Sequence, residues 1–527
     1  MLPNSLNRVH FIGVAGSGMA GIALVAHNRG IKVSGSDLKP SKYLEALLAS
    51  GVTVSFGHHS EALDDPSIEL VVISTAIPAD NPEVKAARDR NLEIWPRAKM
   101  LAWLAREHRL LAVTGTHGKT TTSSMLACAL YELGADPTFL VGGVVHSVQA
   151  SAYSGGGECF VVEADESDSS FVHLDPSLAI ITNIEVDHTD HFSCLREVRE
   201  AFRAFLAKLR PEGVAIVCAD DVQLLALARE QGRQVISYGL AKDADYQLLK
   251  NAVDENAAAF GRNPRANVPA AAAAPSELAP GVSTTDPLLS RFAVRTPDGQ
   301  ILQLSLAASP GRHNMLNATA VLAALDWLGF RRSDSVLALR AFAGVGRRFE
   351  VIGRAGEITV VDDYAHHPTE VNATLQAAHD AGFKRVHVLF QPHRYTRTEA
   401  FMEQFATAFE AAQTLFLMPI YTAGESAIDG VSSEALAQAI QRHQPEAVVQ
   451  VLGEREGIPA RLAAVASPGD CIICMGAGDV TQEAPRVLAE LVARTAAVAT
   501  QDGEQPLQLT TLQQAPSVAA VVQSVGQ

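Results

Sequence analysis

Short apolar runs, each followed by a helical pattern, recur along the chain and constrain its fold more than any other feature. In the first 108 residues they lie near 9–13, just before Asp37, and at 70–74. Alternating buried strands and helices are typical of a doubly wound parallel sheet, whose crossover helices cover both faces. The sequence therefore predicts an α/β fold that opens with a Rossmann-like domain over residues 1–108.

The same alternation returns twice more. At 527 residues the chain is too long for one hydrophobic core, because domains usually hold roughly 100 to 200 residues. Runs that predict a second sheet lie at 110–114, 159–162 and 178–182. Runs that predict a third sheet lie at 358–361, 386–390, 415–418 and 471–474. We therefore expect a central P-loop ATPase-like domain with a parallel-rich sheet over 109–340, and a C-terminal Rossmann-like domain over 341–495.

Two segments break this pattern. Residues 253–290 include five consecutive alanines at 270–274 among Pro, Asn, Ser and Gly, and residues 496–527 are rich in Gln, Ser, Thr and Ala without a sustained period. Such compositions bury too little apolar surface to offset the entropy lost on ordering. We expect a disordered insertion in the central domain and a disordered C-terminal tail.

The composition excludes several classes of function. A formal net charge of −16 argues against a nucleic-acid surface, which needs clustered Lys and Arg. No apolar run approaches the roughly 18 residues of a membrane span, and a strand pattern begins at Arg8, which leaves no room for a secretion signal. The close pair Cys471 and Cys474 lies inside an apolar run, so a buried strand is expected there and not a redox site. A cytoplasmic protein without membrane insertion is expected, and its oligomeric state is left open.

A glycine-rich loop follows the first predicted strand. The sequence GVAGSGMAG at 13–21 contains the pattern GxGxxG, and the residues at the expected helix start are Gly16, Ser17, Gly18 and Met19. Such a loop lets the backbone approach a diphosphate, and Asp37 at the end of the next strand can bind ribose hydroxyls. Alone, the pattern fits NAD, FAD or a nucleotide sugar equally well, and the glycines also suit tight packing of helix on strand.

A phosphate-loop motif, TGTHGKTTT at 114–122, lies between an apolar strand and an amphipathic helix. Backbone amides of such a loop cradle phosphates, Lys119 can neutralise the β and γ phosphates, and the Thr120 hydroxyl can reach Mg²⁺. Only two residues separate Gly115 from Gly118, where the general pattern has four. The flanking strand and helix still predict a nucleoside-triphosphate site. Its residues are Gly115, Thr116, His117, Gly118, Lys119, Thr120 and Thr121.

Two acidic clusters follow consecutive strands beside this loop. EADESD occupies 163–168 and begins with Glu163, and EVDHTDH occupies 185–191 and contains His188. Carboxylate oxygens at strand ends beside a phosphate loop are what Mg²⁺ requires, and His188 is a candidate for a further ligand. Each cluster alone also fits a solvated turn, and His188 with His191 would suit zinc. Their position beside the phosphate loop favours magnesium.

Further polar motifs lie in the C-terminal half, in loops or just after apolar strands. They are GRHNMLN at 311–317, RRFE at 347–350, DDYAHHP at 362–368 and QPHRYTR at 391–397. This edge of an open α/β sheet usually binds ligands. Surface ion pairs would also explain the arginines at 347–348, and turns would explain the histidines at 366–367. The basic group His393, Arg394 and Arg397, in so acidic a chain, predicts an anionic ligand.

In this order the motifs resemble the Mur ligase family. The segments that carry the likeness are HFIG at 10–13, GTHGKTTT at 115–122, EADESD at 163–168, GRHN at 311–314, DYAHHPTE at 363–370 and QPHRYTR at 391–397. The resemblance implies an N-terminal domain that holds a UDP-sugar, a central ATPase, and a C-terminal domain that closes over the nucleotide and contacts an amino acid. Departures from the family pattern are few: Ala15 and Ser169 stand where glycine is frequent.

The likeness is closest to the member that uses ATP and Mg²⁺ to join L-alanine to the carboxylate of UDP-N-acetylmuramate in peptidoglycan precursor synthesis. It implies that the glycine-rich loop binds the UDP diphosphate. The implied catalytic residues are Lys119, Glu163 and His188. The implied metal ligands are Thr120 and Glu163 for one Mg²⁺, and Glu163 with His188 for a second. Further ATP contacts are implied for Asn314, Asn317, Arg348 and Asp363. The sugar carboxylate and alanine would face Tyr364, His393, Arg394 and Arg397.

The resemblance also implies an acyl-phosphate mechanism, with His188 and His367 as candidate acceptors of the amine proton. A family member that ligates a recycled tripeptide to UDP-N-acetylmuramate is the alternative. A nicotinamide-dependent oxidoreductase would explain the glycine-rich loop but not the phosphate loop. A catalytically idle nucleotide-binding regulator is disfavoured, because Lys119, Glu163 and His188 are all present.

Overall fold

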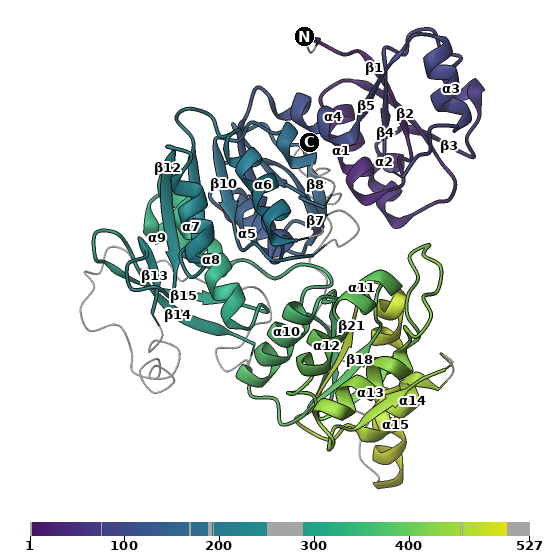
Figure 1. Cartoon of the computed structure of the whole chain (residues 1–527), viewed down its shortest axis with the longest axis vertical. Helices are drawn as coiled ribbons and strands as arrows, with labels where there is room; N and C mark the ends of the chain where they lie inside the picture. The colour runs from purple at the N-terminus through teal and green to yellow at the C-terminus, as the bar shows by residue number, and fades with distance from the viewer. Residues whose placement is uncertain are drawn as a thin grey trace.

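The computed structural model describes residues 3–502 except 75, 168–169, 188–191, 193, 250–287, 454 and 456. As predicted, it consists of three α/β domains, each built on its own sheet (Figure 1). Most of the predicted insertion, and the chain beyond Asp502, lie outside the described residues.

The N-terminal domain has a five-stranded parallel sheet in the order β3-β2-β1-β4-β5. The strands are β1 (Arg8–Ile12), β2 (Lys32–Asp37), β3 (Thr53–Phe56), β4 (Leu70–Ile73) and β5 (Glu93–Pro96). Its α-helices are α1 (Ser17–Asn28), α2 (Glu45–Ala49), α3 (Pro82–Asp89) and α4 (Arg97–Ala105). Both faces of β1 are covered, since Val9 and Phe11 belong to one hydrophobic core and Ile12 to another.

A buried carboxylate joins three elements of this domain. Glu83 of α3 is fully buried, and it lies 2.9 Å from Nε2 of His10 on β1 and accepts a hydrogen bond of 2.7 Å from the Ser36 hydroxyl on β2. His58 lies 3.0 Å from its other oxygen. Burial raises the pKa of Glu83, but the hydrogen bonds with His10 and Ser36 outweigh it, so the pKa lies below the ordinary value.

The central domain has a ten-stranded sheet in the order β15-β14-β13-β12-β11-β10-β6-β9-β7-β8. The strands are β6 (Arg109–Thr114), β7 (Thr138–Val145), β8 (Ala150–Tyr153), β9 (Cys159–Glu163), β10 (Leu178–Ile181), β11 (Val214–Cys218), β12 (Gln234–Gly239), β13 (Tyr246–Leu248), β14 (Ser290–Arg295) and β15 (Ile301–Leu306). The helices are α5 (Lys119–Glu132), α6 (Leu195–Leu206), α7 (Val222–Arg229), α8 (Arg312–Trp327) and α9 (Arg332–Arg340). The interior strands are parallel and only the two margins are antiparallel, so the carboxyl ends of β6, β9 and β10 meet at one edge.

The C-terminal domain has a six-stranded sheet in the order β16-β17-β21-β18-β19-β20, parallel except at β16. The strands are β16 (Glu350–Ala355), β17 (Ile358–Asp363), β18 (Val386–Phe390), β19 (Thr414–Leu417), β20 (Val449–Val451) and β21 (Cys471–Met475). The helices are α10 (Pro368–Asp380), α11 (Tyr395–Ala400), α12 (Met402–Ala408), α13 (Ser433–His443), α14 (Ile458–Val465) and α15 (Glu483–Asp502). Cys471 and Cys474 are fully buried free thiols, which confirms the predicted buried strand.

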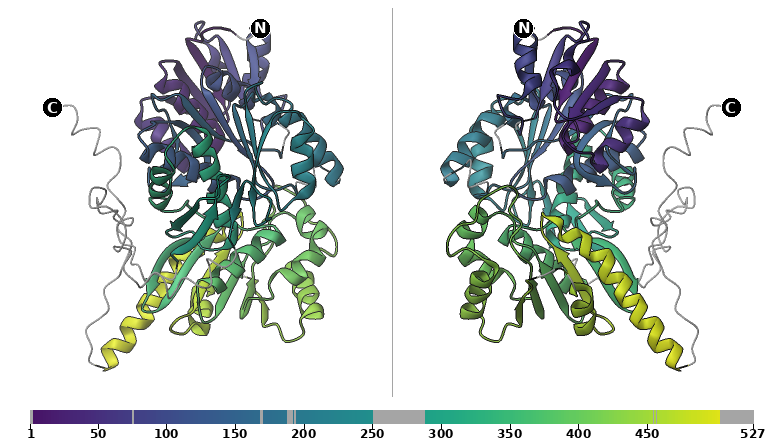
Figure 2. Two further views of the ribbon diagram at one scale, coloured as in Figure 1. Left: turned by 90° about the vertical axis from the view of Figure 1, so that its left-hand side faces the viewer. Right: turned by 90° about the vertical axis from the view of Figure 1, so that its right-hand side faces the viewer.

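Two boundaries differ from the sequence prediction. β14 begins at Ser290, the last residue of the expected insertion, and α15 continues to Asp502, beyond the end expected at residue 495 (Figure 2). Residues 496–499 are mostly alanine, which has the highest helix propensity, so a helix can continue there without an amphipathic pattern.

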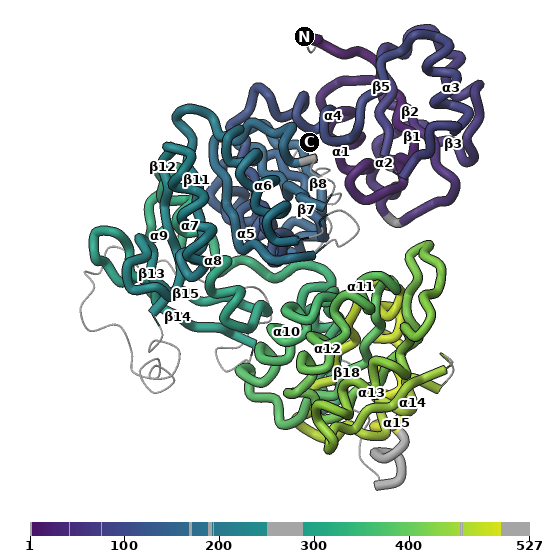
Figure 3. Tube along the Cα trace, viewed as in Figure 1, coloured from purple at the N-terminus to yellow at the C-terminus, as the bar shows by residue number. Residues whose placement is uncertain are grey.

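The N-terminal and C-terminal domains both lie beside the central domain (Figure 3). α1 packs closely on β7 and β8, because a Cβ atom at Gly21 would lie 2.7 Å from Leu140 and 3.1 Å from Ala152. The C-terminal domain meets the central domain through polar side chains beside the phosphate loop, and also through a close approach of Gly311 to α10, where a Cβ atom at Gly311 would lie 2.7 Å from Ala377. Within the described residues, no helix combines the length and apolarity needed to cross a bilayer.

Candidate active site

The phosphate loop connects the end of β6 to the start of α5. Gly115 and Gly118 have φ angles of +127° and +81°, a region that side chains rarely adopt. A Cβ atom at Gly115 would also lie 2.1 Å from the Thr182 hydroxyl. Both glycines are therefore required for the tight turn that directs the first amides of α5 into the loop.

Lys119 bends back over this loop. Its ammonium donates to the carbonyl oxygens of Gly115 at 2.8 Å and Thr116 at 3.1 Å, and to Glu166 Oε1 at 2.8 Å. Burial lowers the pKa of Lys119, but the negative charges of Glu166 and Asp165 outweigh it and hold the pKa above its ordinary value. Lys119 is therefore a fixed positive charge within the loop.

Thr120 and Glu163 lie side by side at the same sheet edge. The Thr120 hydroxyl donates to Glu163 Oε1 at 3.0 Å, and the Gly142 amide donates to Glu163 Oε2 at 2.7 Å. Arg348 approaches from the C-terminal domain, with Nη2 3.4 Å from the Thr120 hydroxyl. A hydroxyl and a carboxylate beside a phosphate loop are hard oxygen donors of the kind that Mg²⁺ prefers. The third predicted ligand, His188, lies outside the described residues.

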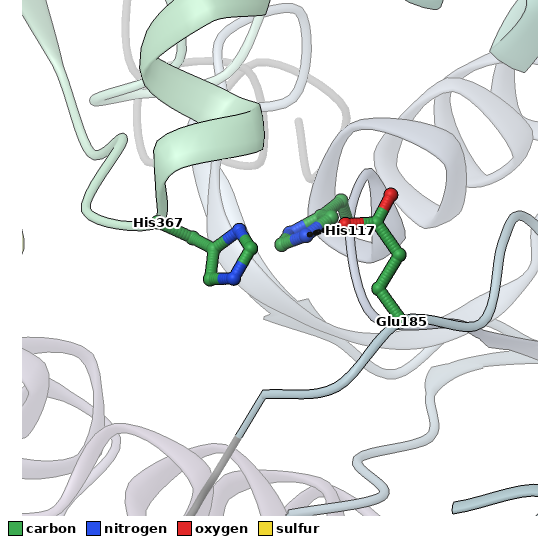
Figure 4. A group of neighbouring side chains, drawn as sticks. All are labelled: His117, Glu185 and His367. Atoms are coloured by element: carbon green, nitrogen blue, oxygen red, sulfur yellow. Dashed lines mark ion pairs between the residues drawn. The ribbon is translucent and has the colours of Figure 1, made fainter. Parts of the chain in front are cut away.

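His117 of the phosphate loop lies between two carboxylates. Its Nδ1 is 3.2 Å from Glu370 Oε1, at the start of α10, and its Nε2 is 3.5 Å from Glu185 Oε2, after β10. Burial lowers the pKa of His117, but Glu185 and Glu370 outweigh this effect and raise it to about 9. The His367 ring lies 4.7 Å away, between centroids (Figure 4).

His117, Glu185 and His367 offer ligand atoms within 4.8 Å of one another, as a metal site would. With a pKa of about 9, His117 holds a proton at neutral pH, and this proton supplies the positive charge between Glu185 and Glu370. His367 Nδ1 is engaged by the Thr369 amide at 3.3 Å. We therefore describe the group as an ion-pair network.

Asn314 and Asn317, which were predicted to contact ATP, are held by hydrogen bonds at the start of α8. Asn314 donates to the Pro310 carbonyl at 2.9 Å, and Asn317 donates to Asn314 at 3.3 Å while its amide oxygen faces Gly118. A cavity of about 710 Å³ lies between the start of α8 and helices α10 and α12, and neither Asn314 nor Asn317 lines it. Its lining includes Arg312, His313 and Thr369.

Asp363 is buried at the end of β17 and holds the turn around Arg348. It accepts hydrogen bonds from the amides of Phe349 at 2.7 Å and Ala365 at 2.8 Å. Burial raises its pKa to about 6. Asp363 thus positions Arg348, and the side chain of Arg348 reaches the phosphate loop.

Of the four predicted substrate residues, two are engaged in ion pairs. Arg394 Nε lies 2.6 Å from Glu425 Oε1, and Arg397 Nη2 lies 2.8 Å from Asp187 Oδ1 in the central domain. The Tyr364 ring lies under the Arg348 guanidinium, 4.9 Å from it, and His393 stacks on Tyr421. Burial lowers the pKa of His393 to about 4, so its ring is neutral.

In the N-terminal domain, the glycine-rich loop is held by Asp37. The Asp37 carboxylate accepts hydrogen bonds from the amides of Ala15 at 2.8 Å and Leu38 at 2.7 Å. Ser17 and Gly18 are exposed at the start of α1, where amides face outward, whereas the Met19 side chain is buried in the core. Met19 can therefore contact a ligand only through its backbone.

Sequence reasoning missed several residues that build this site. Gly142 donates to Glu163, and Asn183 holds the His117 backbone on both sides. Glu185 was part of a predicted acidic cluster, but its pairing with the His117 ring was not predicted. The glycine pair at 142–143 inside a strand was an available signal, because strand glycines mark close backbone approach. The partners of His117 had no local signal, since Glu370 is 253 residues away in sequence.

A phosphate loop in a central α/β domain, joined to a Rossmann-like domain and contacted by a third domain, defines a three-domain nucleotide-dependent enzyme. Three family profiles match in order: "Mur ligase family, catalytic domain" at 8–109, "Mur ligase middle domain" at 113–325 and "Mur ligase, glutamate ligase domain" at 347–478. The chain belongs to the Mur ligase family, whose members are ATP-dependent ligases.

Curated relatives and solved structures agree with this assignment. The chain is 43% identical to UDP-N-acetylmuramate–L-alanine ligase of Pelotomaculum thermopropionicum, over 90% of this chain and 95% of that protein. It is 40% identical to the protein of that name from Agrobacterium fabrum, over 93% and 98%. UDP-N-acetylmuramate-alanine ligase of Thermotoga maritima superposes with a TM-score of 0.70 at 27% identity, covering 92% of this chain and 99% of that one. A murein peptide ligase of Psychrobacter arcticus gives 0.62 at 26% identity, covering 92% and 98%.

Proposed function

We propose that this chain uses ATP to join L-alanine to the carboxylate of UDP-N-acetylmuramate, with release of ADP and phosphate, in peptidoglycan precursor synthesis. The observation that carries the proposal is the cluster of Lys119, Thr120 and Glu163, which is contacted by Arg348 from the C-terminal domain. The curated relatives that share about 40% identity over most of the chain carry the name of this activity.

In the proposed reaction the muramoyl carboxylate attacks the γ-phosphorus of ATP, the bond to the β-phosphate oxygen breaks, and ADP leaves. The amine of alanine then attacks the acyl carbon, phosphate leaves, and the amine loses a proton. Phosphoryl transfer of this kind is accelerated mainly by positioning and charge neutralisation. Lys119 supplies a fixed positive charge, and Arg348 supplies a second one from the opposite side of the site.

We propose that Thr120 and Glu163 hold one Mg²⁺, and that Glu163 with His188 holds a second. When bound there, the ions would neutralise phosphate charge. The donor set fits, because the Thr120 hydroxyl and the Glu163 carboxylate are adjacent and the Gly142 amide fixes the orientation of the carboxylate.

The substrate-binding residues are also part of the proposal. Amides at Gly16, Ser17 and Gly18 would receive the UDP diphosphate at the start of α1. The cavity of about 710 Å³ that Arg312 and His313 line would take the adenosine of ATP. The muramoyl carboxylate and alanine would lie beside Tyr364, His393, Arg394 and Arg397. A cytoplasmic location follows from the proposal, because ATP and nucleotide sugars are made there.

The alternative within the family, ligation of a recycled tripeptide, is less well supported. The murein peptide ligase of Psychrobacter arcticus superposes with a lower TM-score than the alanine ligase of Thermotoga maritima, 0.62 against 0.70.

The test is phosphate release from ATP with Mg²⁺ and UDP-N-acetylmuramate, with and without L-alanine. We expect release to require both substrates and to be lost in Lys119→Ala, because the fixed charge in the phosphate loop is removed. Turnover with the tripeptide, and none with alanine, would replace the proposal by the recycling reaction. The oxidoreductase alternative predicts binding of NAD(P)H, which the same protein preparation can be tested for.

A further inference from the structure

His117 connects the phosphate loop to two different parts of the molecule. Its backbone is fixed within the central domain, where its amide donates to Asn183 Oδ1 at 2.9 Å and its carbonyl accepts from the Thr182 hydroxyl at 2.6 Å. Its ring extends to Glu370 of the C-terminal domain. The side chain thus spans the boundary between the domains, while the backbone is part of the loop that would hold phosphates.

The partners of the ring are themselves linked across this boundary. Thr369 at the start of α10 donates its hydroxyl to Glu185 Oε2 at 2.8 Å, and Glu185 lies beside the His117 ring. Glu370 completes the capping box of α10 by accepting from the His367 amide at 3.4 Å. The ring therefore contacts a carboxylate on each side, one from each domain, and the C-terminal carboxylate is fixed at the end of a helix.

We propose that His117 is a positioning residue whose ring holds the C-terminal domain docked against the phosphate loop. The inference rests on the proposed function only where ligation kinetics are measured. Domain docking can be measured without any ligation activity. The helix that Glu370 caps begins at Pro368, four residues after Tyr364, which is proposed to face the second substrate.

The charged groups that face His117 set the pH dependence of this contact. Glu185 follows β10, Glu370 begins α10, and Arg348 lies 3.9 Å from Glu370. The remaining neighbour, His367, is neutral because burial lowers its pKa to about 4. Since Glu185 and Glu370 raise the pKa of His117 from 6.5 to about 9, the ion pairs are complete below pH 6.5 and are lost as the pH rises through about 9.

Domain docking can be followed by energy transfer between two dyes on the full-length protein. Cys194 of the central domain is exposed, and the other five cysteines are buried. A second site, Glu446→Cys, lies on the exposed surface of the C-terminal domain. The variants to compare are His117→Gln, which removes the charge, and His117→Lys, which restores a charge of higher pKa. Thermal unfolding of each variant checks that the chain is folded.

We expect energy transfer in the otherwise unchanged protein to fall as the pH rises through about 9. His117→Gln should lower the transfer at neutral pH and abolish the alkaline transition, and His117→Lys should move the transition to higher pH, because an ordinary Lys has a pKa of about 10.4. His387→Gln is the matched control, since His387 pairs with Asp470 inside the C-terminal domain, and it should behave like the parent.

The kinetic arm uses kcat and KM for ATP in the alanine ligation. His117→Gln should lower kcat/KM for ATP roughly tenfold or more, because a charge-assisted contact across the site is lost. Glu370→Gln should have a similar effect from the other domain, and the double variant should be little worse than either alone. The proposal is overturned if His117→Gln keeps the parent's energy transfer and alkaline transition. Absence of ligation by the parent protein would overturn the proposed function alone.

Discussion

Gly142 decides how closely β7 approaches the phosphate-loop cluster. A Cβ atom there would lie 2.6 Å from Glu163 Oε2 and 2.9 Å from the Thr120 hydroxyl. We expect Gly142→Ala to displace the Glu163 carboxylate and to lower kcat roughly tenfold or more, with an increased Mg²⁺ requirement, because small misplacements at a phosphoryl-transfer site are costly. Titration of activity with Mg²⁺ measures both effects.

Gly453→Ala is the control for this substitution, because nothing lies within 4 Å of a Cβ atom at Gly453 and its backbone is not in the left-handed region. Equal activity of the two alanine variants would contradict the role assigned to Gly142.

Contacts between residues of one motif, or of two adjacent strands, could be predicted from the sequence. Contacts between residues of different domains could not. The close association of Lys119 with its own loop and of Thr120 with Glu163 follows from a strand, a turn and a helix that are contiguous or adjacent in the sheet. The pairing of Arg397 with Asp187 depends on two domains meeting, and no pattern within either segment indicates it.

At the scale of elements, Glu83 connects α3 to β1 and β2. Glu83→Gln should destabilise the N-terminal domain by about 1–3 kcal/mol, because an uncharged amide cannot accept all the hydrogen bonds that the buried carboxylate accepts. Since the pKa of Glu83 lies below 4.5 in the folded protein, the difference from the parent should be complete above pH 4.5 and should shrink as the pH falls below it.

Thermal unfolding followed by tryptophan fluorescence measures this effect, because Trp95 and Trp103 both lie in the N-terminal domain. Glu61→Gln, on the exposed surface of the same domain, is the control. An unchanged unfolding midpoint for Glu83→Gln at neutral pH would show that the buried carboxylate does not stabilise the domain.

Elements were predicted well where apolar runs were continuous. The predicted strands at 110–114 and 386–390 correspond to β6 and β18, because buried parallel strands are apolar on both faces. Polar or alanine-rich segments gave no such signal. The C-terminal part of α15 is one example, since its helical propensity comes from alanine and not from an amphipathic face.

At the scale of the whole molecule, the buried ion pair between Asp187 and Arg397 joins the central and C-terminal domains. We expect Asp187→Asn and Arg397→Gln each to lower kcat/KM for alanine roughly 30-fold or more, because each removes one member of a buried ion pair between the domains. The double variant should be less impaired than the product of the two effects. Steady-state kinetics of all four proteins form the test cycle, and strictly multiplicative effects would indicate that Arg397 acts on the substrate independently of Asp187.

The boundary between the N-terminal and central domains has a consequence for which substrates the enzyme accepts. Gly21 lets α1 pack closely on β7 and β8, and Arg97 of the N-terminal domain pairs with Asp165 of the central domain, so the two domains are joined by both apolar and polar contacts. If the loop at Gly16 holds the diphosphate as proposed, its separation from Lys119 is constant. The distance between the diphosphate-binding loop and Lys119 then selects the substrate. A nucleotide sugar is accepted only if the distance from its diphosphate to its reactive carboxylate matches the distance between these two loops.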